Sequence, residues 1–212
     1  MKTLKIAPIL LAAGLFLSSQ SQAQHQSIGI KAGFQSSTLD GSKLTNTMNG
    51  KSLGLQYLFH VSDGFVFGAD LIYSQAGGYY SYPVPEYGHQ NFEIRLHQLR
   101  FVPKAYVFFR DESYKFRPLM GVGLAATYNM KEQNMKETSM NENGPYASNI
   151  LPFSMDAVMD LGFQYRIQNN TKFTCNLEYS SGLTMMQKSR PSTPETLRNH
   201  MLGFNVGIAQ MF

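Results

Sequence analysis

The end of the chain, residues 202–212, alternates strictly between two kinds of side chain and stops on an aromatic residue. The even positions are Leu202, Phe204, Val206, Ile208, Gln210 and Phe212. A β-strand has a period of two, so these side chains lie on one face and the small or polar ones lie on the other. An apolar face with an aromatic carboxy-terminus is typical of a transmembrane β-barrel, in which that face meets lipid.

The same alternation recurs along the chain and predicts eight strands. They are expected at residues 27–35, 52–60, 65–74, 97–109, 115–128, 153–167, 172–180 and 202–212. No position on the apolar faces carries a formal charge, although 15% of the chain is charged. The opposite faces collect the charged residues Lys31, Asp70, Arg100, Lys104, Arg117, Asp156, Asp160, Arg166 and Glu178.

This pattern predicts an all-β fold, an eight-stranded antiparallel up-and-down transmembrane barrel whose charges face the lumen. A barrel of this size is just wide enough to be filled by side chains, and buried charges need partners. The charged face is also rich in glycine, for example Gly121 and Gly123, which suits a narrow lumen better than a solvated sandwich face. A soluble calycin-like barrel, with its apolar residues inside, is the alternative fold. Pro103 and Pro118 each predict a bulge or a register shift, since proline removes a ladder donor.

The predicted connections alternate in length. Residues 61–64, 110–114 and 168–171 form short turns, whereas residues 36–51, 75–96, 129–152 and 181–200 form long loops. Outer-membrane barrels have short periplasmic turns and long extracellular loops, so we expect both termini on the periplasmic side. The second long loop contains Tyr79, Tyr80, Tyr82 and Tyr87, which could form a recognition surface because tyrosine offers rigid amphipathic contact area. The alternative is an aromatic loop that binds nothing.

The beginning of the chain has the features of a secretory signal peptide. Lys2 and Lys5 precede a short apolar run, and small residues follow up to Ala23. We therefore expect a signal peptide at residues 1–23 and a barrel domain at residues 24–212. The single cysteine, Cys175, leaves no internal disulfide and no cysteine-rich metal site. The net charge of +4 is too small to indicate nucleic-acid binding.

Three segments resemble strands of the PorT-like outer-membrane β-barrel family. They are the segments Leu99–Tyr106, Phe116–Leu124 and Tyr179–Thr184. The resemblance implies a small Gram-negative outer-membrane barrel, usually of undefined function. The founding member of that family assists a protein-secretion system, so a secretion-system protein is a candidate partner.

We expect a structural or surface-interaction role, in which a filled barrel presents its loops to a partner at the cell surface. A narrow passive channel is the first alternative, and a lipid-modifying enzyme is the second. The histidines show no spacing that indicates catalysis or metal binding, so neither an enzyme nor a cofactor is expected. The expected partners are outer-membrane lipid and, through the strand that ends at Phe212, the barrel-assembly machinery.

Overall fold

A computed structural model of the chain describes residues 26–40, 46–84, 88–136, 151–184 and 198–212. Side chains are described in the same ranges except at 39–40, 46, 79–84, 88–94 and 131–136. The predicted signal peptide at residues 1–23 lies outside the described residues. No helix in the described part of the chain is long and apolar enough to cross a membrane.

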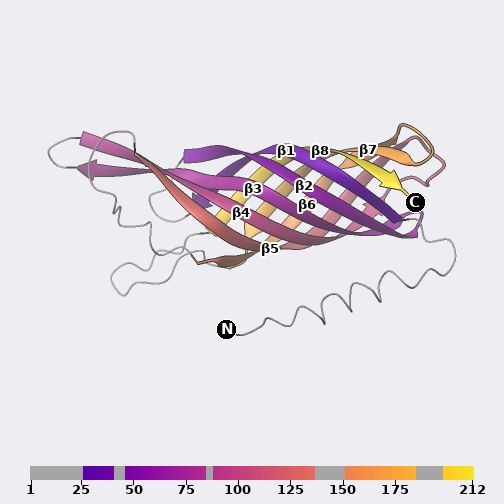
Figure 1. Cartoon of the computed structure of the whole chain (residues 1–212), viewed down its shortest axis with the longest axis horizontal. Helices are drawn as coiled ribbons and strands as arrows, with labels where there is room; N and C mark the ends of the chain where they lie inside the picture. The colour runs from indigo at the N-terminus through magenta and orange to yellow at the C-terminus, as the bar shows by residue number, and fades with distance from the viewer. Residues whose placement is uncertain (1–25, 41–45, 85–87, 137–150, 185–197) are drawn as a thin grey trace, which may run out of the picture.

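Eight antiparallel strands form a closed barrel in which each strand pairs with its neighbours in sequence (Figure 1). The strands are β1 (Gln26–Asp40), β2 (Asn46–Ser62), β3 (Phe65–Val84), β4 (Gly88–Phe108), β5 (Phe116–Lys136), β6 (Phe153–Arg166), β7 (Thr171–Gly182) and β8 (Arg198–Met211). The ladder between β1 and β8 runs from Ser27↔Met211 to Asp40↔Arg198 and closes the barrel. Backbone hydrogen bonds of 2.9 and 3.3 Å between Gln26 and Phe212 complete the closure at the carboxy-terminus.

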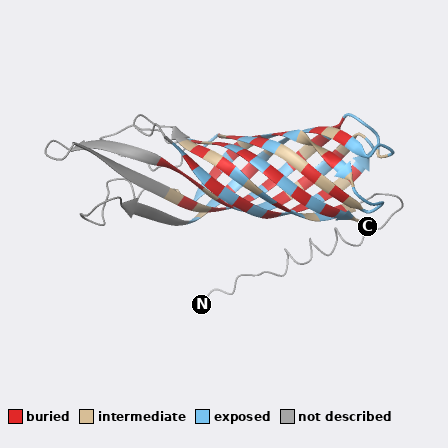
Figure 2. Ribbon diagram, turned by 90° about the horizontal axis from the view of Figure 1, so that it is seen from above, coloured by how far each residue is buried: buried red, intermediate tan, exposed pale blue. Residues whose placement is uncertain are grey.

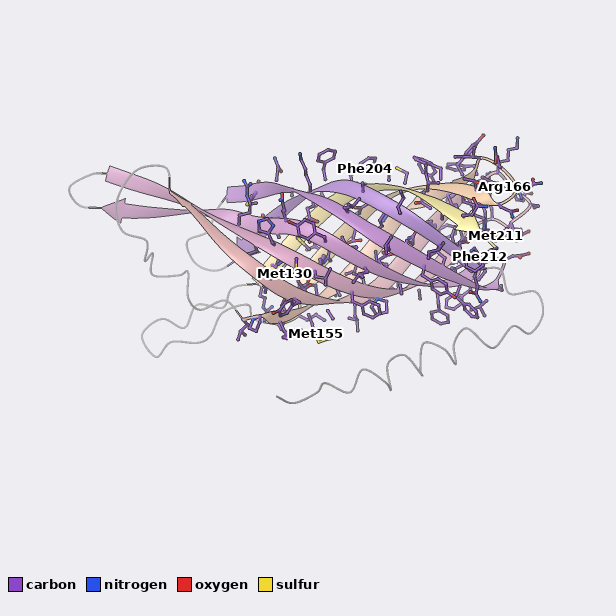
Figure 3. All side chains as sticks on the ribbon, in the orientation of Figure 1. Met130, Met155, Arg166, Phe204, Met211 and Phe212 are labelled. Atoms are coloured by element: carbon purple, nitrogen blue, oxygen red, sulfur yellow. The ribbon has the colours of Figure 1, made fainter. Side chains whose placement is uncertain are left out.

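Burial alternates along every strand and gives the wall a chequered appearance (Figure 2). Leu124 and Phe204 on the outer face are each 47% exposed, whereas Asp70 and Arg100 on the inner face are 0% and 1% exposed. Phe204 points away from the barrel (Figure 3). The wall is thus apolar outside and polar inside, as predicted for a membrane barrel, and the alternative of a soluble barrel with an apolar interior is wrong.

The predicted long loops are shorter than expected because the strands continue into them. The ladder between β3 and β4 reaches Val84↔Gly88, and the ladder between β4 and β5 reaches Phe92↔Lys136. The predicted loop at 75–96 is therefore mostly a β-hairpin. Apolar alternation stops where a strand leaves the lipid, but backbone pairing does not depend on it. Polar composition alone consequently made these strand ends look like loops.

The expected bulges at the two prolines are not present. Pro118 pairs with Phe163 in an unbroken ladder, so β6 is in regular register there. The ladder between β4 and β5 omits Val102 and Pro103, but the register is the same on both sides of the gap. Because proline lacks only its own N–H, the ladder loses local pairing without needing an extra residue.

Candidate functional site

The centre of the lumen is held by one lysine that contacts three carboxylates. The Nζ atom of Lys104 on β4 lies 3.0 Å from Asp70 Oδ2, 2.7 Å from Asp160 Oδ2 and 2.8 Å from Glu178 Oε2. These carboxylates come from β3, β6 and β7, so a single ammonium group joins four strands across the barrel. A lysine ammonium has three N–H donors, which matches the three acceptors.

Two further cations complete this arrangement. Lys31 on β1 lies 2.7 Å from Asp70 and 3.7 Å from Glu178, and Arg100 on β4 lies 2.9 Å from Glu178. All of these side chains are at most 6% exposed. We call these six residues the central network: Lys31, Asp70, Arg100, Lys104, Asp160 and Glu178. Buried charges of this kind are tolerated because each has a partner of opposite sign.

Glycines on the inner face make room for the central network. A Cβ atom built on Gly123 would lie 2.8 Å from Lys104 Cγ, and one built on Gly121 would lie 2.5 Å from the ring of Tyr106. The Tyr106 hydroxyl donates to Asp160 Oδ2 at 3.2 Å, and the Asn176 amide donates to Asp160 Oδ1 at 2.8 Å. The glycines therefore have a packing role, since a larger side chain would meet the Tyr106 ring at Gly121 and both the backbone of β4 and Lys104 at Gly123.

Asp156 lies in the lumen but outside the ion pairs of the central network. Its Oδ2 atom accepts a hydrogen bond of 3.2 Å from Thr127, and its Oδ1 atom has no hydrogen-bond partner among the described residues. The side chain is buried at 1% exposure. Its cross-strand partner is Ala125, which belongs to a buried apolar cluster with Ile72, Val102 and Val158, so this carboxylate lies beside apolar side chains and is only partly paired.

An apolar layer lies between the central network and the barrel end that carries the short turns. We call it the apolar ring, and it consists of the buried residues Leu58, Val66, Tyr106, Phe108 and Leu119. The remaining space beside it is a small cavity that is lined in part by Gln56 and Gln164. The apolar ring comes from β2 to β5 only, so between the two charged layers the lumen is apolar on one side and polar beside Gln56 and Gln164.

A second charged layer closes the short-turn end. Glu112, in the turn between β4 and β5, places Oε1 3.2 Å from His60 Nδ1, 3.4 Å from Arg117 Nη1 and 3.1 Å from Lys172 Nζ. We call these four residues the end cluster. Arg117 also donates to the carbonyl oxygens of Arg110 and Asp63, and its guanidinium lies 4.2 Å from the centre of the Phe108 ring. The end cluster is thus stacked directly on the apolar ring.

The environment of Glu112 favours its charged form. The contact with His60 is the largest influence, and the positive charge of Lys172 adds to it, so the pKa of Glu112 lies well below its usual value. Burial acts in the opposite direction but is outweighed. The carboxylate consequently stays ionised over the neutral and mildly acidic range.

Eight of the nine charged residues predicted for the lumen are buried there, and Arg166 is the exception. Arg166 is half-buried at the short-turn end, the same end of the barrel as Met211 and Phe212 (Figure 3), and its Nη2 donates to the carbonyl oxygen of Ser113 at 2.8 Å. The backbones of Tyr79, Tyr80 and Tyr82 belong to β3, but their side chains lie outside the described ones, as does the whole of Tyr87.

Sequence reasoning missed three members of the end cluster. His60 and Lys172 are on the inward phase of their strands, and this alternation could have revealed them. Glu112 could not be found in this way, because it comes from a turn and has no strand phase. Only the folded path of the turn brings its carboxylate over the lumen.

The described residues do not form a recognisable catalytic or metal-binding set. Among them, no group of three or more histidine, cysteine, aspartate or glutamate side chains could hold a metal ion. His97 bonds to the Tyr73 hydroxyl through Nδ1 at 2.5 Å on the outer wall. Ser181 and His200 are opposite each other on β7 and β8, but no hydrogen bond between their side chains occurs in the described structure.

With the barrel and its lumen in view, the class of protein can be stated. The chain belongs to the outer membrane protein beta-barrel domain family, whose model matches residues 8–209. The fold, the apolar outer wall and this family place the protein in the outer membrane. No curated protein sequence is significantly similar to the chain.

Solved structures show the same fold at low sequence identity. The outer membrane protein OprG from Pseudomonas aeruginosa is 14% identical with a TM-score of 0.53, over 89% of this chain and 97% of that one. Neisserial surface protein A is also 14% identical with a TM-score of 0.50, over 88% of this chain and 97% of that one. These likenesses concern the fold and do not transfer a function.

Proposed function

We propose that this protein is a non-conducting barrel that anchors a raised β-sheet at the cell surface and offers it to a partner. The observation that carries the proposal is the unequal height of the strands. β5 continues to Lys136, whereas its ladder with β6 ends at Tyr128↔Phe153. At about 3.3 Å per residue, roughly 26 Å of β5 extends beyond the last pair with β6.

We call the parts of β3, β4 and β5 that extend beyond the rest of the barrel at the long-loop end the raised sheet (Figure 1). It includes the backbone of Tyr79, Tyr80 and Tyr82, the residues that the sequence suggested for recognition. A paired sheet is stiffer than a loop of the same length, so a partner would lose less ordering entropy on binding to it. We place the raised sheet outside the cell and the short turns in the periplasm, because outer-membrane barrels generally have this orientation.

The filled lumen favours this role over that of a narrow channel. A permeating ion would have to pass the levels of the central network, the apolar ring and the end cluster in succession, and the buried side chains at these levels support a lumen without a continuous water-filled path. We therefore expect no stable single-channel steps when the purified protein is inserted into planar lipid bilayers. Steps that disappear when Gly121 is replaced by Phe would support the channel instead.

Crosslinking in living cells tests the interaction role. A photo-crosslinking amino acid at Tyr80 should give a discrete adduct of higher mass, whereas the same group at Tyr114, in a short turn, should not give that adduct. The proposal fails if neither position is crosslinked while the bilayer recordings show conductance.

We also propose that the protein has no catalytic role in lipid modification. His97 on the outer wall forms a hydrogen bond with the Tyr73 hydroxyl, and this bond occupies its Nδ1 atom. The lipid A mass spectra of the wild-type strain and of a His97→Ala strain should therefore be identical, and a missing modification in the variant would contradict this.

The resemblance to PorT-like barrels and the role of the carboxy-terminus remain parts of this proposal. Phe212 is 66% exposed at the end of the closing strand, and an aromatic residue at this place supports the proposed recognition by the barrel-assembly machinery. Secretion-system proteins are among the partners that crosslinking at Tyr80 would identify.

A further inference from the structure

The buried carboxylates on the long-loop side of the apolar ring outnumber the buried cations there by one. The central network contains three cations and three carboxylates, so its own charges balance. Asp156 adds a fourth carboxylate, and no basic side chain of the described residues lies within ion-pair distance of it. The end cluster has a surplus of positive charge, but from Arg117 to Ala125, which pairs with Asp156, the distance along β5 is roughly 26 Å.

The neighbouring polar groups satisfy Asp156 only in part. Thr127 donates to Oδ2 at 3.2 Å, and Oδ1 has no hydrogen-bond partner among the described residues. Arg100, which pairs with Thr127 across β4 and β5, directs its Nη1 to Glu178 at 2.9 Å and its Nη2 to Ser180 at 3.2 Å. A buried carboxylate without a charged partner is costly, so this position favours a further positive charge.

Other buried oxygen atoms in this part of the lumen also lack partners. Three of them are Ser74 Oγ, Gln98 Oε1 and Asn199 Oδ1, which belong to residues that are at most 2% exposed on the inner faces of β3, β4 and β8. Against them stands one unpaired nitrogen of a described side chain on this side of the lumen, Arg100 Nε. Acceptors therefore outnumber donors, which suits a positively charged or donor-rich ligand.

The strand position opposite Asp156 leaves room beside its carboxylate. Asp156 pairs with Gly182 on β7, which has no side chain, and a Cβ atom built on Gly182 would lie 3.0 Å from the backbone nitrogen of Asn199 on β8. The inward-facing Asp156 and Asn199 are thus separated by a position without a side chain. Asp156 is about 10 Å along β6 from its first residue, Phe153, so an ion from the long-loop end would not have to pass the central network.

We propose that Asp156 binds a partly hydrated monovalent cation in the lumen, on the long-loop side of the central network. Asp156 Oδ1 is the charged ligand, and the unpaired oxygen atoms of neighbouring strands accept hydrogen bonds from the water molecules of the ion. One positive charge balances the surplus carboxylate, whereas a divalent ion such as Ca²⁺ is usually held by several carboxylates. This site does not depend on whether the raised sheet binds a partner.

Thermal unfolding of the full barrel in phosphatidylcholine vesicles tests the site, with Na⁺ as the probe. NaCl replaces N-methylglucamine chloride at constant ionic strength and neutral pH, so only the size of the cation changes. Because a ligand that binds the folded state stabilises it, each tenfold rise in Na⁺ above the dissociation constant should raise the midpoint by about 3–5 °C. In Asp156→Asn, which keeps an acceptor for Thr127 and removes the surplus charge, the midpoint should not depend on Na⁺. The matched control is Asp63→Asn, which removes an exposed carboxylate from a short turn and should respond to Na⁺ like the wild type.

Sodium NMR gives a second measurement that does not require unfolding. At equal protein concentration, vesicles with the wild-type barrel should relax the Na⁺ signal faster than vesicles with Asp156→Asn. Equal relaxation, or equal Na⁺ dependence of the two midpoints, would overturn the proposal. A wild-type midpoint without Na⁺ dependence would also overturn it, since Asp156 would then be protonated or hydrated by water alone. Stabilisation by Ca²⁺ at lower concentrations than by Na⁺, if lost in Asp156→Asn, would contradict the monovalent assignment.

Discussion

The central network and the end cluster are both charged layers of one lumen, but they are built in different ways. The central network comes from strands alone, and its lysine is 1% exposed with three carboxylate partners. The end cluster has the reverse polarity, since one carboxylate from a turn, 22% exposed, faces three basic side chains. The comparison shows that strand residues form the buried ion pairs in the middle of the barrel, whereas a partly exposed turn residue forms the ion pairs at its end.

The largest loss of stability should come from replacing Lys104, the residue at the centre of the central network. Lys104→Met leaves Asp70, Asp160 and Glu178 with fewer partners in a buried site, so we expect the free energy of unfolding to fall by about 3–5 kcal/mol. Urea unfolding of the reconstituted barrel, followed by circular dichroism, measures the change.

A double variant keeps this test informative. Adding Asp160→Asn to Lys104→Met removes one of the uncompensated charges and should restore part of the lost stability. A loss below about 1 kcal/mol in the single variant would mean that the network is solvated, since exposed ion pairs contribute no more than this.

A smaller loss of stability is expected from a substitution at Gly121, which lies beside Tyr106 where the central network meets the apolar ring. In Gly121→Ala the new Cβ atom would lie 2.5 Å from the Tyr106 ring, so the ring and its bond to Asp160 must shift. Overpacking of this kind costs about 1–3 kcal/mol. The matched control is Gly203→Ala, whose nearest atoms would be 3.6 Å away, and which should leave the thermal midpoint unchanged or slightly higher. Equal losses in the two variants would indicate a backbone effect.

The smallest effect should come from the end cluster. Glu112→Gln removes the charge that holds the turn, but the site is partly exposed and screened, so we expect a loss of about 1 kcal/mol at pH 7. The pKa of Glu112 in the folded barrel is lowered from its unfolded value of about 4.3. Its stabilisation is therefore complete above about pH 5 and declines as the pH falls toward the folded-state pKa.

A pH series separates the end cluster from the central network. The difference in stability between the wild type and Glu112→Gln should shrink as the pH falls below about 5, where the carboxylate takes up a proton. High salt should reduce it as well, whereas the loss in Lys104→Met should change little, because buried pairs are screened much less. A Glu112→Gln difference that grows as the pH falls below about 5 would contradict the assigned direction of the pKa.

The parts that could be predicted from the sequence are those governed by strand alternation. The phase of Lys31, Asp70 and Glu178 follows from the period of two, and so does the apolar wall. The pairing of Lys104 with three carboxylates could not be predicted, because it depends on the stagger between four strands. Alternation also carries no information on Glu112, which lies in a turn, or on the raised sheet, whose strands continue after the apolar pattern ends.

The most direct test of the account is carbene labelling from a lipid that carries a diazirine in its acyl chain, with the adducts mapped by mass spectrometry of the reconstituted protein. The account predicts adducts at Phe67, Leu124 and Phe204, which are 47–50% exposed on the outer wall, and none at Arg100, Asp156 or Glu178. Adducts at the three charged residues, with Phe67, Leu124 and Phe204 protected, would contradict it.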